Sequence, residues 1–173
     1  MLHPPWRWPC WWGWRHRATP GWRHRWCPPT WPFGRATCYL VGHARGYQFY
    51  TCQVQANGYG WVLQTPWAGL VDDSGRYVAR HYAGPTWAAR DNSAVVAAPV
   101  ASAPAPSGDA IPWLLLQGTS TSGPSGGTFS GTTYIQRINT TGGLAPTSGC
   151  DAAHVGATAA VYYTADYYFY RAA

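Results

Sequence analysis

From about residue 42 onward, short apolar runs alternate with turn residues along the chain. Residues 47–55 alternate, which places Tyr50, Cys52 and Val54 on one face of a strand and Phe49, Thr51 and Gln53 on the other. Asn57–Gly58 follows, a favoured pair for a hairpin turn, and residues 61–64 are predicted as the return strand. This pattern of alternating runs and tight turns is typical of antiparallel β-structure.

Turns at Asp72–Gly75 and Asp91–Ser93 continue the same pattern. Only residues 151–158 have the pattern of a short helix. Roughly seven or eight strands predict one all-β domain over residues 42–170, a single antiparallel β-sandwich or barrel. The remaining strands are predicted at residues 76–82, 94–101, 111–119, 132–139 and 161–170.

Composition separates the first 38 residues from this domain. They hold six arginines, eight tryptophans and seven prolines but no acidic residue, whereas residues 39–173 hold six arginines and all six aspartates. The formal charge of +6 therefore belongs to residues 1–38, and we expect no nucleic-acid partner for the domain. Because the prolines interrupt any helix or central strand, we predict that residues 1–38 form an unstructured tail.

Three interpretations of the tail remain open. Arginine interleaved with tryptophan suits anionic membrane surfaces or single-stranded nucleic acid. The third interpretation, which we favour, is a mistranslated start, because GC-rich DNA yields this composition in a wrong frame and the chain has no lysine or glutamate. No apolar run before Tyr39 has the roughly 7 to 15 residues of a secretion signal, and none elsewhere approaches the roughly 20 of a membrane span.

Several motifs of the domain are similar to those of one family. Over about residues 48–170 the chain resembles the uncharacterised secreted family catalogued as domain of unknown function 3455, which is found in bacteria and fungi. The resemblance implies an extracellular or cell-envelope location, and it implies no established activity. The motifs are HYAGPTW at 81–87, APAP with AIPWLLL between 103 and 116, TYIQR at 133–137, GCDAAH at 149–154 and YTADYYFY at 163–170.

The resemblance also bears on the cysteines. Cys52 and Cys150 are the two that lie outside the tail, and an even count in a chain resembling exported proteins implies a disulfide between them. A buried free thiol at Cys52 and a reactive Cys150 assisted by His154 are the alternatives.

The sequence contains no recognisable metal or cofactor motif. The domain histidines, His43, His81 and His154, are too widely spaced for a known zinc pattern. Some fungal relatives bear a malate dehydrogenase label, but no G-x-G-x-x-G follows a strand here and no βαβ alternation exists. We therefore expect neither a metal nor a cofactor, and we reject the dehydrogenase label.

Polar and aromatic residues on several predicted strands suggest where a ligand would bind. Three of these residues flank the Gly84–Pro85 turn. A buried Arg137 would need either a bound anion or a carboxylate, and Asp166 or Asp109 is its expected carboxylate partner. The candidate ligand-binding residues are His81, Tyr82, Trp87, Trp113, Gln117, Tyr134 and Arg137.

These observations predict a secreted or cell-envelope binding protein without catalysis. Its expected partner is a polysaccharide or a small polar ligand, because exposed aromatic rings on a sheet suit sugars. The alternatives are a hydrolase that uses His81 with an aspartate, and a cationic tail that binds membranes or nucleic acid.

Overall fold

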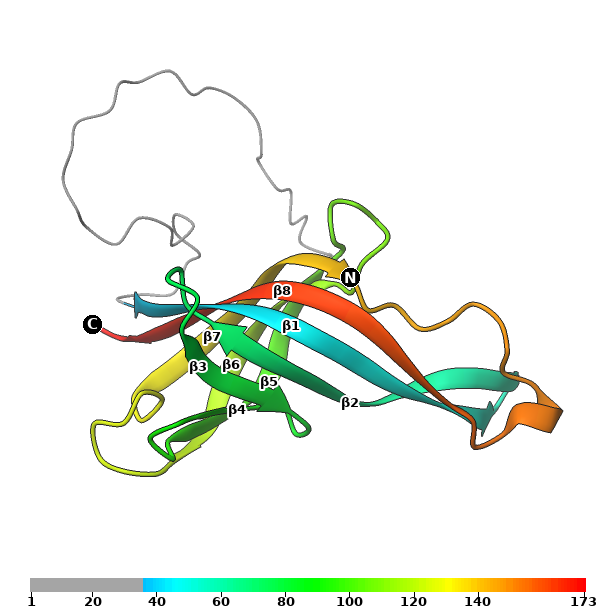
Figure 1. Cartoon of the computed structure of the whole chain (residues 1–173), viewed down its shortest axis with the longest axis horizontal. Coiled ribbons are helices and arrows are strands. Elements are labelled where there is room, and N and C mark those ends of the chain that lie inside the picture. Colours follow the sequence, from blue (N-terminus) through cyan, green and yellow to red (C-terminus); the bar gives the residue numbers. More distant parts are fainter. Residues whose placement is uncertain (1–35) are drawn as a thin grey trace, which may run out of the picture.

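The computed structural model describes residues 36–173 as one closed, eight-stranded antiparallel barrel (Figure 1). The strand order follows the chain, and β8 pairs with both β7 and β1, which closes the sheet. The all-β prediction is confirmed, and of the two predicted forms the structure is a barrel and not a sandwich. The strands are β1 (Ala36–Gln55), β2 (Gly58–Val71), β3 (Tyr77–Tyr82), β4 (Thr86–Ala89), β5 (Ala94–Ala103), β6 (Trp113–Ser122), β7 (Thr132–Gly142) and β8 (Thr158–Ala172).

Several boundaries differ from the sequence-based expectations. β1 begins at Ala36, so it includes three residues that we assigned to the tail; the other expectations about the tail concern residues 1–35, which lie outside the described chain. The expected short helix is one 3-10 turn, Ala152–His154, capped by the Asp151 carboxylate. Within residues 36–173, no helix has the length and apolar character that a membrane crossing requires.

The barrel interior combines very small side chains with large aromatic rings. On β1 and β2 the chains approach closely, because a Cβ at Gly46 would lie 2.7 Å from the Ala68 Cβ. The rings of Trp87, Tyr167 and Phe169 fill the space that these small residues leave, and each is at most 1% exposed. The Trp87 ring centre lies 5.3 Å from that of Tyr167 and 6.1 Å from that of Phe169. Such edge-to-face contacts favour one defined packing of the core.

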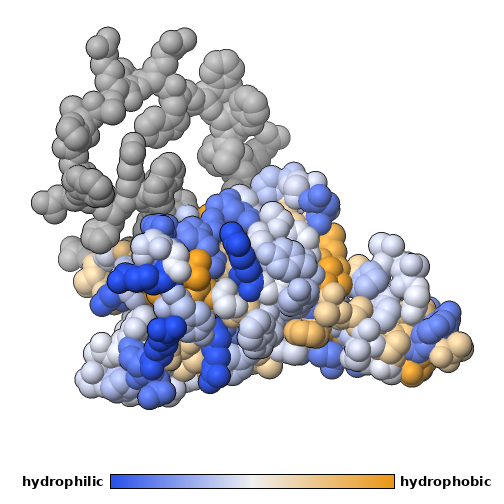
Figure 2. Space-filling view, viewed as in Figure 1, coloured by the Kyte–Doolittle hydropathy of each residue, from blue (hydrophilic) through white to orange (hydrophobic). Residues whose placement is uncertain are grey.

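Three strands continue beyond the barrel as an extension (Figure 1). The extension consists of the second half of β1 between residues 58–67 of β2 and residues 158–162 of β8. This part of β2 does not pair with β3, and this part of β8 does not pair with β7. Figure 2 shows this extension projecting from the body of the molecule.

A disulfide joins Cys52 to Cys150 in the extension, as the family resemblance implied, with their Cα atoms 5.3 Å apart. Two backbone hydrogen bonds support it: the Cys52 N–H donates to the Ala157 carbonyl at 2.8 Å, and the Gly156 N–H donates to the Cys52 carbonyl at 2.9 Å. A disulfide of this kind is compatible with an extracellular location.

Candidate functional site

Three of the seven predicted ligand-binding residues meet inside the barrel. His81 on β3 and Trp87 on β4 are cross-strand partners, and their rings stack with centres 4.2 Å apart. Arg137 on β7 is the cross-strand partner of Tyr167 on β8. Because cross-strand partners point to the same face of a sheet, the Arg137 side chain points inward with Tyr167, whose ring centre lies 5.3 Å from that of His81.

The other four candidates lie on the outer face. Gln117 and Tyr134 are cross-strand partners on β6 and β7. Because side chains alternate along a strand and Arg137 points inward, both of them point outward. Tyr82 follows the inward-facing His81 and packs under the Arg80 guanidinium, 5.4 Å from its ring centre.

Trp113 begins β6 and is also outward by alternation, since its neighbour Leu114 packs against the core. Its Nε1 is buried and makes no hydrogen bond within residues 36–173. The outer residues therefore do not contribute to the interior cluster.

Arg137 lies at the barrel end nearest the extension, where it holds the segment that connects β5 to β6. Its Nε and Nη2 both donate to the Pro112 carbonyl, at 3.1 and 2.8 Å. The Thr140 hydroxyl donates to the Ile111 carbonyl at 2.6 Å, and the Ile111 N–H donates to the Gly142 carbonyl at 2.9 Å. These contacts fix the connecting segment, residues 104–112, which we call the strap, and they also fix the orientation of the guanidinium.

The aspartates that we expected to pair with Arg137 lie elsewhere. Asp166 instead binds His43 Nδ1 at 2.6 Å and accepts a hydrogen bond from Asn139 at 2.8 Å. Asp109 is exposed on the strap. Within residues 36–173, Arg137 forms no ion pair with a carboxylate. The Pro112 carbonyl accepts from its guanidinium, and the Tyr167 hydroxyl also interacts with it.

Four buried polar atoms in the interior lack a hydrogen bond of good geometry within residues 36–173. Among them, the Tyr167 hydroxyl is close enough to interact with the Tyr163 hydroxyl and with the Arg137 guanidinium. Trp87, Tyr163 and Tyr167 are at most 1% exposed, and Gln48 is 2% exposed. Native proteins contain few such atoms, and each one left unpaired costs about 1 to 3 kcal/mol. The four atoms are Gln48 Oε1, Trp87 Nε1, Tyr163 OH and Tyr167 OH.

The two tyrosines among these residues lie near Arg137. Its positive charge acts on the pKa values of His81, Tyr163 and Tyr167, which places all three near the guanidinium. Gln48 and Tyr163 both border Gly143, where an added Cβ would lie 3.3 Å from the Gln48 Cγ and 2.9 Å from the Tyr163 Cβ. The unsatisfied atoms therefore belong to one cluster rather than to separate parts of the core.

Burial determines the protonation of the cluster. It lowers the pKa of His81 to about 3, although the hydrogen bond of Nδ1 with the Thr86 carbonyl (2.9 Å) raises that pKa; the Arg137 charge lowers it further. Since a carbonyl only accepts, His81 Nδ1 carries the proton. Burial also raises the pKa of Tyr163 and of Tyr167, so both phenols keep their protons near pH 7. The guanidinium is thus the charged group of the cluster at neutral pH.

The hydrolase alternative receives no support from this geometry. Among the described residues no aspartate hydrogen-bonds to His81, whose Nδ1 is held by the Thr86 carbonyl. An imidazole with a pKa of about 3 is also a weak base at neutral pH.

Sequence reasoning missed Gln48, Tyr163 and Tyr167 as members of the site. The signal was present, because residues 163–169 place Tyr163, Ala165, Tyr167 and Phe169 on one face at a period of two. Tyrosines on the opposite face of the same strand obscured it.

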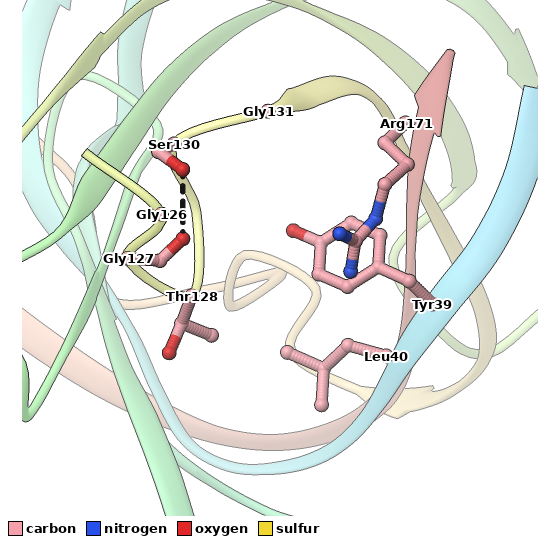
Figure 3. A pocket seen from close by; sticks show the side chains of 8 residues that line it. All are labelled: Tyr39, Leu40, Gly126, Gly127, Thr128, Ser130, Gly131 and Arg171. Carbon is pink, nitrogen blue, oxygen red and sulfur yellow. Dashed lines mark hydrogen bonds between the residues drawn. The ribbon is translucent and has the colours of Figure 1, made fainter. Parts of the chain in front are cut away.

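A second candidate lies at the other end of the barrel, where a pocket of about 310 Å³ opens between the Arg171 side chain and a glycine-rich loop (Figure 3). The guanidinium carbon of Arg171 lies 3.9 Å from the Tyr39 ring centre. The polar groups around it have partners: the Tyr39 hydroxyl bonds to Thr132 at 2.6 Å, and the Ser130 hydroxyl donates to the Gly127 carbonyl at 2.9 Å. Because these polar groups already have partners, the pocket is a weaker candidate for a ligand-binding site than the interior cluster.

Exposed aromatic rings form a third feature, on the outer face of the extension. Trp67, Tyr47 and Tyr162 are cross-strand neighbours on β2, β1 and β8, and they are 55%, 42% and 50% exposed. The planes of Tyr47 and Tyr162 meet at 72°, however. These rings therefore do not form the flat surface on which a sugar chain stacks.

Comparison with known families agrees with the motif analysis. Residues 32–171 match the family model described as protein of unknown function (DUF3455). The chain belongs to this family. Neither the curated proteins nor the solved structures include a significant match to this DUF3455 protein. The resemblance drawn from the motifs is confirmed, and the function must be argued from the site itself.

Proposed function

We propose that this DUF3455 protein is a secreted or cell-envelope binding protein that takes up a small polar ligand in the barrel interior, beside Arg137. The observation that carries the proposal is the cluster of four buried polar atoms without a hydrogen-bond partner in the described chain. Because an unpaired buried polar atom costs about 1 to 3 kcal/mol, these atoms favour a partner from outside the protein.

The arrangement of the atoms favours one ligand over scattered waters. Gln48, Trp87 and Tyr163 come from three different strands, β1, β4 and β8. Tyr163 lies near the Arg137 side chain of β7, Gln48 and Tyr163 both border Gly143, and the Trp87 ring packs against Tyr167. Convergent polar groups on rigid strands, set among aromatic rings, are typical of small-molecule sites. A closed eight-stranded barrel is wide enough either to be filled by side chains or to hold one small ligand.

Binding without catalysis agrees with the chemistry of the cluster. His81 is neutral and lacks a carboxylate partner in the described chain. Tyr163 and Tyr167 retain their protons near pH 7 because burial raises their pKa values. The groups can therefore donate hydrogen bonds, but they do not form an acid–base pair.

The extracellular part of the proposal rests on two supports. The Cys52–Cys150 disulfide suits an oxidising compartment, and the family resemblance implies export.

Thermal unfolding of the full-length, oxidised protein with a library of small polar compounds tests the proposal. The library contains sugars, sugar acids, amino acids and small carboxylic acids. A ligand at about 100 times its dissociation constant raises the free energy of unfolding by about 2.7 kcal/mol. Tyr163→Phe removes one hydroxyl from the cluster, whereas the matched control Tyr162→Phe removes the adjacent hydroxyl, which is on the outer face and 50% exposed.

We expect at least one compound to stabilise the wild type and Tyr162→Phe equally, and to bind about tenfold more weakly to Tyr163→Phe. A library without effect on the wild type, or equal binding by Tyr163→Phe, would refute the interior site. Polysaccharide binding that is lost in Tyr162→Phe and kept in Tyr163→Phe would instead assign the function to the outer aromatic rings.

A further inference from the structure

The charge of Arg137 is uncompensated inside the barrel. Its Nε and one Nη2 hydrogen are used by the Pro112 carbonyl, and a guanidinium has five N–H groups. Among the described residues, the Tyr167 hydroxyl also interacts with the guanidinium, but no carboxylate pairs with it. A partly buried cation without a carboxylate partner costs free energy, so the site favours a negatively charged ligand.

The neighbours of Arg137 are also donors. Trp87 Nε1 can only donate a hydrogen bond, and the Tyr163 and Tyr167 hydroxyls each carry a proton to donate. The two hydroxyls are close enough to influence one another's pKa, but they do not form a hydrogen bond of good geometry. Gln48 Oε1 is the one acceptor among the four atoms, so donors predominate beside Arg137 and a ligand there must supply acceptors.

We infer that the ligand carries an oxyanion, a carboxylate or phosphate group, and that Arg137 binds this group together with the Tyr163 and Tyr167 hydroxyls. The inference rests on the proposed function and narrows it to a chemical class. The planar guanidinium matches both kinds of oxyanion with two parallel hydrogen bonds. The strap contributes by fixing the guanidinium through the Pro112 carbonyl, so little conformational entropy is lost on binding.

The charge state of the site supports this assignment across neutral pH. An arginine guanidinium is positively charged over this whole pH range. His81 does not add a second charge, because burial lowers its pKa to about 3, and the two phenols remain neutral because burial raises their pKa values. We therefore expect the affinity for an oxyanion that is fully ionised, such as acetate, to stay constant between about pH 6 and pH 8.

Matched pairs of small probes test the inference in the full-length protein. Acetate is compared with acetamide, and inorganic phosphate with trimethyl phosphate, at constant ionic strength set with chloride. Binding is measured by thermal unfolding and by the ¹⁵N chemical shift of Arg137 Nε. We expect acetate, phosphate or both to stabilise the protein and to shift Arg137 Nε, and the neutral partner of each pair to do neither. The two anion arms distinguish a carboxylate ligand from a phosphate ligand.

Four variants separate the charge of Arg137 from its contact with the strap. Arg137→Gln removes the charge, and Arg137→Lys keeps the charge without the planar fork. Thr140→Val weakens the strap through Ile111 but leaves the cation in place, and Arg171→Gln removes a guanidinium at the other end of the barrel. We expect anion binding to weaken about tenfold or more in Arg137→Gln, less in Arg137→Lys and in Thr140→Val, and not in the control Arg171→Gln.

The possible failures are distinguishable. Equal weakening by Arg171→Gln, or no Arg137 Nε shift with either anion, would overturn the inference. If a neutral compound binds with dependence on Tyr163 while acetate and phosphate do not bind, the proposed function stands and the oxyanion assignment falls. Should Arg137→Gln fail to fold, Arg137→Lys and the wild-type Nε shift give the same decision.

Discussion

Replacing Cys52 and Cys150 by alanine together should remove a large share of the stability of the barrel. The bridge spans a sequence separation of 98 residues, and a loop of this length constrains the unfolded chain by about 4.7 kcal/mol in the chain-entropy account. Measured losses for native disulfides lie at about 2 to 5 kcal/mol, and we expect the double variant to fall in that range. For a domain of this size the melting temperature should drop by roughly 6 to 16 °C.

Urea unfolding of the oxidised wild type, the two single alanine variants and the double variant measures this effect. Because either single substitution already breaks the bridge, we expect the second substitution to add little to the loss caused by the first. A loss below about 1 kcal/mol in the double variant, or fully additive single losses, would contradict the reasoning. Either result would mean that the unfolded chain keeps its ends together without the bridge.

Two further predictions concern packing and pH. Gly46→Ala should lower the free energy of unfolding by about 1 to 3 kcal/mol or more, because the new Cβ would collide with the β2 backbone. The control Gly131→Ala should lower it little, because a Cβ there faces open space, and equal urea midpoints for the two variants would refute this. Hydrogen bonds of His43 with Asp73 and with Asp166 raise the pKa of His43, despite the opposing effect of burial. The contribution of the His43 interactions to the free energy of unfolding should therefore be complete below about pH 6.5 and disappear as the pH rises through the folded-state pKa. In urea titrations from pH 5 to pH 9, His43→Gln should remove this dependence, and a wild-type advantage that grows with pH would contradict it.

Turn residues made much of the fold predictable. Asp72–Gly75 does form the turn between β2 and β3, with Gly75 at a φ of 78° and the Gly75 N–H donating to the Asp72 carbonyl at 2.8 Å. β4 escaped prediction because Thr86–Ala89 has only four residues between two turns, too few for an alternating pattern to appear. Its Trp87 was nevertheless chosen as a site residue from its neighbours in the sequence.

The site was only partly predictable because strand register decides which residues meet. Register pairs Arg137 with Tyr167 and brings both toward His81, and no local pattern encodes that alignment. The partner of Arg137 is a backbone carbonyl, which every residue possesses and which therefore leaves no trace in the sequence. One long-range signal exists: Tyr163 pairs with Gly46, so a large residue on β8 faces the smallest residue on β1.

The closed strand order has a consequence for how the chain folds. Every pairing except that of β1 with β8 joins strands that are consecutive in the sequence and can form as local hairpins. The β1–β8 seam joins the two ends of the described chain, so the entropy of closing this loop is repaid only when most other pairings exist. Cys52 on β1 and Cys150 just ahead of β8 lie at one end of that seam. We therefore expect oxidation of the two thiols to be a late event, so that the rate at which the bridge forms in a refolding chain would report the rate at which the barrel closes.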